Sequence, residues 1–311
     1  MGLYLVTGCA GFVGSHLSER LLERGDTVRG VDAFTDYYER SVKEGNLSAL
    51  READGFELAE ADLAEESLEP LLDGVDGIFH LAAQPGVRGS WGGTFAVYAR
   101  DNLVATQRLF EAAAGAGRRV VFASSSSVYG NAETYPTTED LEPKPVSPYG
   151  VTKLTCEHLA RVYGESFGLD VIALRYFTVY GPRQRPDMAF TRIAKALASG
   201  DRFTVMGTGE QSRDFTYVGD AVAATLLSME SGTAGAVYNV GGGQEASLRE
   251  IIELGERLSG RTLNVVNEPA AAGDVTRTAA NTGRIRSDTG WEPKVALEEG
   301  FRSQLAWAGA L

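Results

Sequence analysis

Short apolar runs alternate with longer helix-like segments through the first half of the chain, and this alternation constrains the fold more than any other feature. The apolar runs are Leu3–Val6, Thr27–Val31, Gly77–Leu81, Arg119–Ala123 and Val171–Leu174. Such runs are typical of strands buried on both faces of a parallel sheet. The helix-like segments are Val13–Arg24, Phe95–Ala116 and Pro148–Phe167. We therefore predict an α/β fold with a doubly wound parallel sheet.

The pattern of predicted elements changes after about residue 180. Shorter elements follow, punctuated by Pro182, Pro186, Gly200, Gly207 and Gly209. We predict a doubly wound domain over residues 1–180 and a smaller α/β part over residues 181–311 that covers a ligand. Part of the segment 221–245 is expected to return to the first domain.

The chain is acidic, which bears on its partners. Its 311 residues include 42 Asp and Glu against 29 Lys and Arg, a formal charge of −13. Because a broad acidic surface repels polyphosphates, we expect no nucleic-acid partner. No apolar stretch approaches the roughly eighteen residues of a membrane span, and the first residues lack the basic start of a secretory signal. We expect no membrane partner.

Cysteine and histidine are scarce. Cys9 and Cys156 lie far apart, and His16, His80 and His158 show no metal-ligand spacing. We therefore expect buried, reduced thiols, a cytoplasmic location and no metal site.

A Gly-rich turn, Thr7–Gly14, follows the first predicted strand directly and precedes a helix. Its sequence, TGCAGFVG, places Gly8, Gly11 and Gly14 in a GxxGxxG spacing. Glycines at this junction permit a tight turn and a close approach of the backbone to a pyrophosphate on the helix N-terminus. We predict a dinucleotide site here, with Phe12 and Val13 at its edge.

Asp32 ends the second predicted strand and indicates which dinucleotide binds. A carboxylate there accepts hydrogen bonds from both adenosine ribose hydroxyls and repels a 2′-phosphate, which favours NAD over NADP. The alternative is that Asp32 merely begins a turn. Asp62 and Leu63, after the third strand, are expected beside the adenine.

Tyr149 and Lys153 give the first indication of chemistry. Four residues apart on a helix, the two side chains share one face. A nearby cation stabilises a phenolate, so we expect Lys153 to lower the pKa of Tyr149 for acid–base catalysis. Strand ends face the ligand crevice of a doubly wound sheet, which brings Ser125 and Ser126 toward Tyr149.

Together these features resemble the extended short-chain dehydrogenases/reductases, and more narrowly the NAD-dependent nucleotide-sugar epimerase/dehydratase family. The resemblance rests on TGCAGFVG, Asp32, the serine run before Val128-Tyr129-Gly130, and YGVTK. It covers essentially the whole chain. Further matches are His80–Ala83, Asn102, Arg175–Phe177 and Arg213–Phe215.

The resemblance implies roles that spacing alone does not assign. The cofactor is expected against Leu81, Ala82, Ala83, Asn102 and Tyr176, with Asn102 supporting the strand of the active site. Arg213 is expected to bind the nucleotide diphosphate, and Lys153 the ribose as well as the phenol. The family also implies a homodimer formed through Phe95–Ala116 and Pro148–Phe167.

The serine run bears on the reaction. Members of this family begin by oxidising C4 of the sugar, as tyrosinate takes the hydroxyl proton and NAD takes the hydride. The family's dehydratases carry Thr-Asp-Glu before VYG, and its UDP-glucuronate decarboxylases carry Thr-Ser-Glu. Here the three positions are Ser125, Ser126 and Ser127. Hydroxyls shuttle a proton but supply no acid–base pair for elimination, so the resemblance favours epimerisation, with Ser127 at the substrate.

The segment Gly181–Phe190 bears on the substrate. It resembles the GPxxRPDMA stretch of UDP-glucuronate 4-epimerases, and the segment Gln84–Arg88 resembles theirs as well. Arg185 is then the carboxylate clamp, because a guanidinium fork matches a carboxylate in bidentate fashion. Alternatively Arg185 only pairs with an acidic surface and Arg183 substitutes for it. The other substrate contacts expected in these segments are Arg88, Met188 and Ala189.

Two departures from the family pattern concern the substrate. Where UDP-galactose 4-epimerases carry Asn after RYF, this chain carries Thr178, a hydroxyl in place of an amide. Those enzymes also carry an Arg before Gly273-Asp274, where this chain has Ala270–Ala272. Diphosphate binding is then left to Arg213 and Arg277, and Asp274 is expected at the ribose.

The leading hypothesis is a UDP-glucuronate 4-epimerase that uses NAD and a UDP-sugar substrate. The alternatives are an epimerase for neutral sugars such as UDP-glucose, then a UDP-glucuronate decarboxylase, then a non-catalytic NAD-binding regulator. The regulator would be expected to lack Tyr149 or Lys153, and both are intact. The resemblance favours uracil as the base and leaves dTDP-sugars open.

Overall fold

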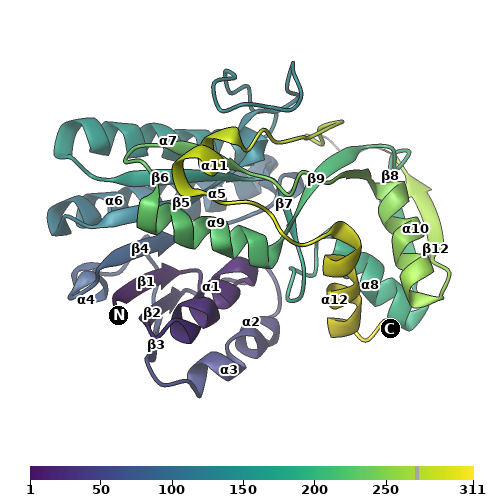
Figure 1. The fold of residues 1–311 in the computed structure, drawn as a ribbon, viewed down its shortest axis with the longest axis horizontal. Helices are drawn as coiled ribbons and strands as arrows, with labels where there is room; N and C mark the ends of the chain where they lie inside the picture. The colour runs from purple at the N-terminus through teal and green to yellow at the C-terminus, as the bar shows by residue number, and fades with distance from the viewer. Residues whose placement is uncertain (270–272) are drawn as a thin grey trace.

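A sheet of seven parallel strands forms the larger part of the molecule (Figure 1). The computed structural model describes residues 1–269 and 273–311. The strands lie in the order β10 (Val237–Val240), β6 (Val171–Tyr176), β5 (Arg119–Ser125), β4 (Gly77–His80), β1 (Leu3–Thr7), β2 (Thr27–Asp32) and β3 (Phe56–Glu60). The chain order reverses between β1 and β4, which creates a crevice at the carboxyl ends of these strands. The predicted doubly wound sheet is confirmed.

Helices cover both faces of this sheet. One face carries α1 (Phe12–Glu23), α9 (Val218–Ser231) and α11 (Gly283–Thr289), with α2 (Arg40–Asn46) and α3 (Ser48–Arg51) beside α1. The other face carries α4 (Glu69–Leu72), α6 (Ala105–Ala116) and α7 (Pro148–Phe167). Each face packs its own apolar layer, around Leu109 and Phe110 on one side and Leu17 and Trp291 on the other. Burial on both faces explains why the central strands β4 and β5 are rich in apolar residues.

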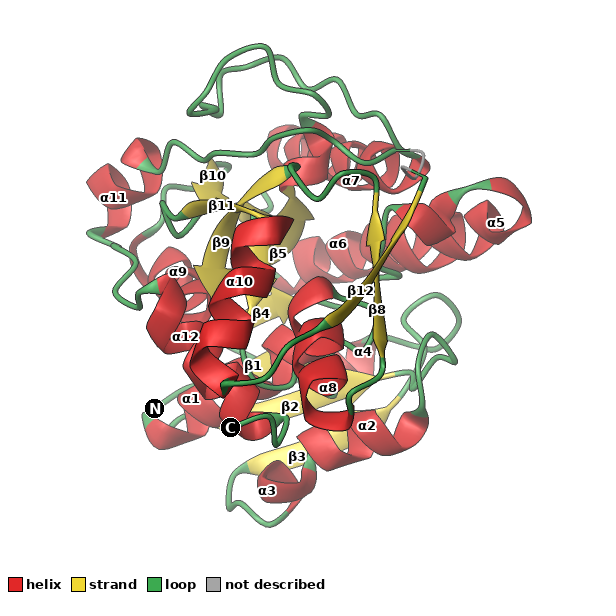
Figure 2. Ribbon diagram, turned by 90° about the vertical axis from the view of Figure 1, so that its right-hand side faces the viewer, coloured by secondary structure: helices red, strands yellow, loops and turns green. Residues whose placement is uncertain are grey.

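The smaller part lies at the right of Figure 1 and faces the viewer in Figure 2. Its strands are β7 (Thr178–Tyr180), β9 (Ser212–Tyr217) and β11 (Glu245–Ser247) in one sheet, and β8 (Arg202–Met206) paired with β12 (Asn264–Glu268). Its helices are α8 (Ala189–Ser199), α10 (Leu248–Ser259) and α12 (Leu297–Trp307). Tyr180, Phe190, Phe215 and Phe301 are central to its separate core. Between these elements in sequence, α9 and β10 return to the large sheet.

The segment predicted as one helix, Phe95–Ala116, is interrupted. It consists of α5 (Phe95–Tyr98), a π-helical turn at Ala99–Val104 and then α6. The wide turn carries Asn102, whose side-chain oxygen accepts from the Gln84 backbone N–H at 2.7 Å. Its amide donates to the Thr152 hydroxyl on α7 at 3.0 Å. Such turns are frequent at functional sites, and here the turn lets one side chain tie two segments together.

The end of one strand differs from the prediction, because β6 includes Arg175 and Tyr176, which were expected after it. β5 ends at Ser125, inside the serine run. Short 3-10 turns follow at Ser126–Val128 and, before α5, at Arg88–Ser90 and Gly92–Thr94. Within the described ranges, the chain forms no helix that is both long and apolar enough to cross a bilayer.

Candidate active site

A single cavity of about 710 Å³ opens at the carboxyl ends of the large sheet and extends to the smaller part. It brings together nearly all of the residues that the sequence predicts for the site. Those on its wall are Gly8, Gly11, Phe12, Val13, Gly14, Asp32, Asp62, Leu63, Leu81, Ala82, Ala83, Arg88, Ser125, Ser126, Ser127, Tyr149, Lys153, Tyr176, Thr178, Arg185, Met188, Ala189, Arg213 and Asp274.

The Gly-rich turn has the shape that a dinucleotide pyrophosphate requires. Gly8 has a positive φ of 72°, and a Cβ there would lie 2.9 Å from the Ala82 backbone nitrogen. A Cβ at Gly14 would lie 2.1 Å from the Gly8 carbonyl oxygen. α1 begins after Gly11 with no side chain capping its first N–H groups, which therefore face the cavity. These backbone donors and the helix dipole fit the phosphates of NAD.

Asp32 lies where the ribose is expected, next to a cation that the sequence reasoning missed. Its carboxylate accepts from the backbone N–H groups of Ala10 at 3.2 Å and Phe34 at 2.8 Å. The Lys43 ammonium lies 3.6 Å from the same carboxylate, and both side chains are buried. Lys43 also donates to the Thr35 carbonyl at 3.0 Å. The predicted carboxylate is therefore one half of a buried ion pair on the cavity wall.

Tyr149 and Lys153 are placed by the first turns of α7. The hydroxyl of Ser147 caps the helix by accepting from the Gly150 N–H at 3.1 Å, and Pro148 occupies the first helical position. Lys153 donates to the Ala123 carbonyl on β5 at 2.8 Å, and its ammonium lies 4.9 Å from the centre of the Phe122 ring. The Tyr149 ring packs edge-on against Tyr98 at 6.3 Å. The two side chains share one face, as the spacing predicts.

Two groups besides Lys153 bear on the pKa of Tyr149. Burial raises the pKa of Tyr149, while a hydrogen bond from Ser125 and the charge of Arg185 act to lower it. Burial in turn lowers the pKa of Lys153 to about 8. That Lys153 lowers the pKa of Tyr149 stays a prediction.

Two predicted contacts do not line the cavity. Asn102 is fully buried behind the wall, where it holds the Gln84 backbone and Thr152. Its contact with the cofactor stays a prediction. Arg277 pairs with Glu245, at 2.7 and 2.8 Å, and stacks on Tyr135. Its contact with the diphosphate likewise stays a prediction.

Arg185 lies on the cavity wall, but its guanidinium already has a carboxylate partner. Asp187 accepts from the Arg185 Nε and Nη2 groups, each at 3.0 Å, and also from the Tyr37 hydroxyl at 3.2 Å. Arg183 turns to the other side and donates to Glu19 on α1 at 2.7 Å. Of the two arginines, only Arg185 lines the cavity.

Basic side chains also lie where residues 86–89 and 273–275 line the cavity. Arg88 donates to Asp274 at 2.7 Å. Asp274, which is expected at the ribose, is thus bound to Arg88, which is expected at the substrate. Arg213 donates to the Ser212 carbonyl at 2.7 Å and lines the cavity. Burial lowers the Arg213 pKa, and the Asp274 carboxylate opposes that effect. The substituted segment Ala270–Ala272 lies outside the described residues.

Sequence reasoning missed part of the wall. Lys43 and Tyr37 are two such residues, and the smaller part adds Arg192, Phe203, Thr204, Met206 and Gln211. Their side chains come from segments distant in sequence, and no motif includes them. Asp187 also lines the cavity; it lies inside the GPxxRPDMA stretch, which assigns it no role. Throughout residues 1–269 and 273–311, no three of His, Cys, Asp and Glu are grouped as metal ligands. His80, bonded to Thr7 and Thr106 in the core, has its pKa lowered by burial to about 3.

Comparison with known proteins agrees with this geometry. The model of the NAD dependent epimerase/dehydratase family matches residues 4–241. The uncharacterized UDP-glucose epimerase YtcB of Bacillus subtilis is 43% identical over 99% of this chain and 98% of its own. A UDP-glucuronate 4-epimerase of Thermodesulfobacterium geofontis is 36% identical over 99% of this chain and 96% of its own.

A solved structure is similar over almost its full length. The UDP-glucuronic acid 4-epimerase of Bacillus cereus, in complex with UDP-glucuronic acid and NAD, superimposes with a TM-score of 0.96 at 39% identity. The match covers 98% of each chain. These findings confirm the predicted fold class and the prediction of NAD as the cofactor. The chain belongs to the NAD-dependent epimerase/dehydratase family.

Proposed function

We propose that this chain interconverts UDP-glucuronate and UDP-galacturonate by epimerisation at C4 of the sugar. The observation that carries the proposal is the meeting of Tyr149, Ser125 and Arg185 on one wall of the cavity that also holds the Gly-rich turn. Bound NAD would take up the C4 hydride and return it, so that a 4-keto sugar links the two epimers. The Gly-rich turn and Asp32 would hold NAD.

Tyr149 is the base that the geometry offers for the C4 hydroxyl. Hydrogen bonding by Ser125 and the positive charge of Arg185 both lower the pKa of Tyr149 and so favour the tyrosinate. Lys153 would contact the ribose of the cofactor as well as fix the end of β5. The proton taken from the sugar returns from Tyr149 after the ketone has turned its other face to the cofactor.

The acidic groups of the wall favour epimerisation over elimination. Positions 125–127 carry only hydroxyls. Elsewhere on the wall, within the described part of the chain, each carboxylate is engaged by a basic side chain. The pairs are Asp32 with Lys43, Asp62 and Asp101 with Arg100, Asp187 with Arg185, and Asp274 with Arg88. Because each of these carboxylates is already held by a cation, we propose that none removes a proton from C5.

Arg185 is the proposed partner of the substrate carboxylate. Its bonds to Asp187 use Nε and Nη2, which leaves the Nη1 group for a ligand on the same wall. A partner for this carboxylate matters chemically, because oxidation at C4 makes a β-keto acid. Such an acid loses CO₂ when its carboxylate stands perpendicular to the ketone plane. Thr178, Met188 and Ala189 lie on the wall as further proposed contacts.

The test is to incubate the purified protein and NAD with UDP-glucuronate and with UDP-glucose separately, and to follow both by NMR. The proposal expects UDP-galacturonate from the first, with little UDP-pentose. Fast conversion of UDP-glucose and none of UDP-glucuronate would overturn it. A parallel incubation with dTDP-glucuronate tests whether the protein recognises the nucleobase of the substrate.

A neutral-sugar epimerase is the second candidate, and one observation favours it. Arg185 is already paired with Asp187 when no uronate is bound. Arg185 would therefore keep a partner when a neutral sugar occupies the cavity. The similarity to the Bacillus subtilis protein named a UDP-glucose epimerase points the same way. The NMR comparison distinguishes the two candidates directly.

We further propose a homodimer, formed through α5–α6 and α7. These helices expose a set of large apolar side chains, which are Phe95, Val97, Val104, Val151, Val162 and Phe167. Sedimentation of the protein at several concentrations tests this.

We also propose a division near residue 180 into an NAD-binding and a substrate-binding domain, with α9 and β10 in the first. The two separate cores support this division. The buried free thiols Cys9 and Cys156 support a cytoplasmic location.

A further inference from the structure

A buried ion pair lies behind the cavity wall, between α7 and β6. The Glu157 carboxylate accepts from the Arg175 guanidinium at 2.7 and 3.0 Å. Both side chains are about 95% buried, with 6% and 5% exposed, and neither lines the cavity. Because replacing such a pair by apolar residues often leaves stability unchanged, stability alone is a weak explanation for it.

Glu157 also holds the strand end that carries the serine run. The Ser124 hydroxyl donates to its carboxylate at 2.5 Å. One turn earlier on α7, Lys153 donates to the carbonyl of Ala123, the residue before Ser124. The helix therefore binds two consecutive residues of β5, directly before Ser125.

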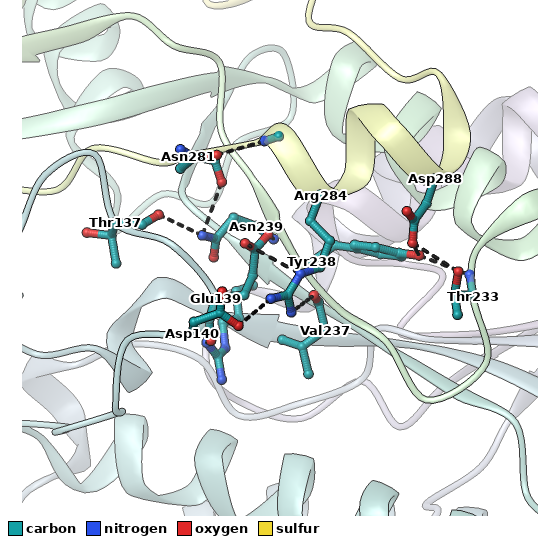
Figure 3. A network of polar contacts seen from close by, with 12 residues as sticks. Thr137, Glu139, Asp140, Thr233, Val237, Tyr238, Asn239, Asn281, Arg284 and Asp288 are labelled. Atoms are coloured by element: carbon teal, nitrogen blue, oxygen red, sulfur yellow. Dashed lines mark hydrogen bonds and ion pairs between the residues drawn. The ribbon is translucent and has the colours of Figure 1, made fainter.

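The far side of Arg175 is connected to the loop that precedes α7. Arg175 donates to the Tyr129 hydroxyl at 2.7 Å, and that hydroxyl donates to Asn239 on β10 at 2.8 Å. Figure 3 shows Asn239 at the centre of the outer network, where its backbone N–H donates to Glu139 at 2.8 Å and its side chain to the Thr137 carbonyl at 2.9 Å. Tyr129, Thr137 and Glu139 are thus joined through Arg175 to α7, the helix that carries Tyr149 and Lys153.

We propose that Glu157, held by Arg175, is a positioning residue of the active site. Its carboxylate fixes the carboxyl end of β5 against α7, so that Ser125 and Lys153 face Tyr149 from a constant direction. The inference rests on the proposed function, because its readout is turnover.

The negative charge of Glu157 has a second consequence, at Lys153. The groups around that ammonium are Cys156 and Glu157 on α7, His80 on β4 and the Phe122 ring on β5. His80 is neutral above its pKa of about 3. Burial lowers the pKa of Lys153 to about 8, and Glu157 acts against that lowering. Without the Glu157 charge, Lys153 should lose its proton at a lower pH.

Two double variants separate positioning from stability. Glu157→Leu/Arg175→Met removes the charges and the acceptor for Ser124, whereas Glu157→Gln/Arg175→Met removes the charges and keeps an acceptor. Both remove the pair as a unit, so no buried charge is left unpaired. The matched control is Arg119→Met/Asp170→Leu. Arg119 begins β5 and Asp170 directly precedes β6, so their 2.6 Å bond joins the two strands at the ends away from the cavity.

Steady-state turnover, NAD affinity and melting temperature are measured for each variant across pH, on whichever UDP-sugar the wild type converts. The Leu/Met variant should lose about ten- to a hundredfold in kcat, because small misplacements of catalytic groups are costly. The Gln/Met variant should keep more of its kcat than the Leu/Met variant. In both, the alkaline limb of the kcat profile should move to lower pH. The control should keep the wild-type profile.

A folded Leu/Met variant with wild-type kcat and an unmoved alkaline limb would overturn the inference and leave the pair a structural one. If the double variants do not fold, Ser124→Ala decides, because it leaves the ion pair intact. That variant should lose about three- to tenfold in kcat, the worth of one hydrogen bond. An unchanged kcat would refute the proposal. A wild type that converts no UDP-sugar refutes the proposed function instead.

Discussion

The Gly-rich turn at residues 7–14 and the segment 181–189 line the same cavity, but they are held in place in different ways. Backbone geometry places the first, between β1 and α1, with Gly8 at positive φ. Side chains from distant segments hold the second. His16 on α1 donates to the Pro182 carbonyl at 2.9 Å, and Gln304 on α12 accepts from the Gly181 N–H at 2.8 Å.

Strain distinguishes the two regions further. Arg183, inside the second segment, has a positive φ of 63°, which a residue with a side chain adopts at a cost of about 1–2 kcal/mol. Its ion pair with Glu19 offsets that cost. The proposed cofactor site is thus placed by regular elements, whereas the proposed substrate site is held by side chains from distant segments.

Tyr149→Phe should have the largest effect. The ring still packs against Tyr98, but no proton acceptor remains at C4. Turnover should fall about a hundred- to ten-thousandfold while NAD binding persists, as measured by NMR turnover and NAD fluorescence quenching. A variant that retains more than about a tenth of the wild-type rate would remove Tyr149 from the mechanism.

Arg185→Ala should damage one substrate much more than the other. A carboxylate left without its partner costs about 2–5 kcal/mol, so kcat/KM for UDP-glucuronate should fall about thirty- to several thousandfold relative to that for UDP-glucose. Some UDP-pentose and CO₂ should also form, because the carboxylate of the β-keto acid is no longer held. Equal losses on both sugars, without pentose, would contradict the clamp.

Asp32→Ala should weaken NAD binding by about tenfold or more, the worth of hydrogen bonds to a charged group. It should also improve the relative binding of NADP, because Lys43 then has no carboxylate partner and attracts a 2′-phosphate. The matched control is Asp32→Ala/Lys43→Met, which should lose the gain for NADP. Calorimetric titration of both cofactors checks this, and an unchanged preference in the single variant would place ribose recognition elsewhere.

Glu19→Gln should have the smallest effect, on the substrate segment alone. Loss of the Arg183 partner should lower kcat/KM for UDP-glucuronate by about fivefold, since a partly buried ion pair contributes about 1 kcal/mol. NAD affinity should not change. Arg20 and Glu23 form an exposed pair on the same helix, so Glu23→Gln is the control and should behave as wild type. A loss of NAD affinity in Glu19→Gln would mean that the two regions are not independent.

Local signals explain what could be predicted. The range Pro148–Phe167 was predicted at both ends, because Pro148 suits a helix start and Gly168, in a left-handed conformation, ends the helix. The interruption at Ala99–Val104 was not predicted, because the residue that Asn102 holds, Gln84, is distant in sequence. The end of β6 was misjudged by two residues, since the Arg175 side chain interrupts the apolar pattern.

The residues of the site fall into the same two groups, those with a local signal in the sequence and those without one. Gly8, Asp32 and Tyr149 stand at fixed positions relative to strands and helices, so topology alone brings them to the cavity. The pairing of Arg277 with Glu245, on another strand, has no signal in the sequence. Lys43 lies outside every motif, and Asp187 lies inside the GPxxRPDMA stretch without an assigned role, so only the fold shows that they pair with Asp32 and Arg185.

The central claim is that hydride leaves C4 of a uronate and returns to the same carbon with the carboxylate retained. The direct test is to incubate the protein and NAD with UDP-glucuronate deuterated at C4 and to follow the products by NMR and mass spectrometry. We expect UDP-galacturonate that keeps deuterium at C4 and keeps its carboxylate. A product that has lost the C4 deuterium to solvent, UDP-pentose as the main product, or no conversion of the uronate would contradict it.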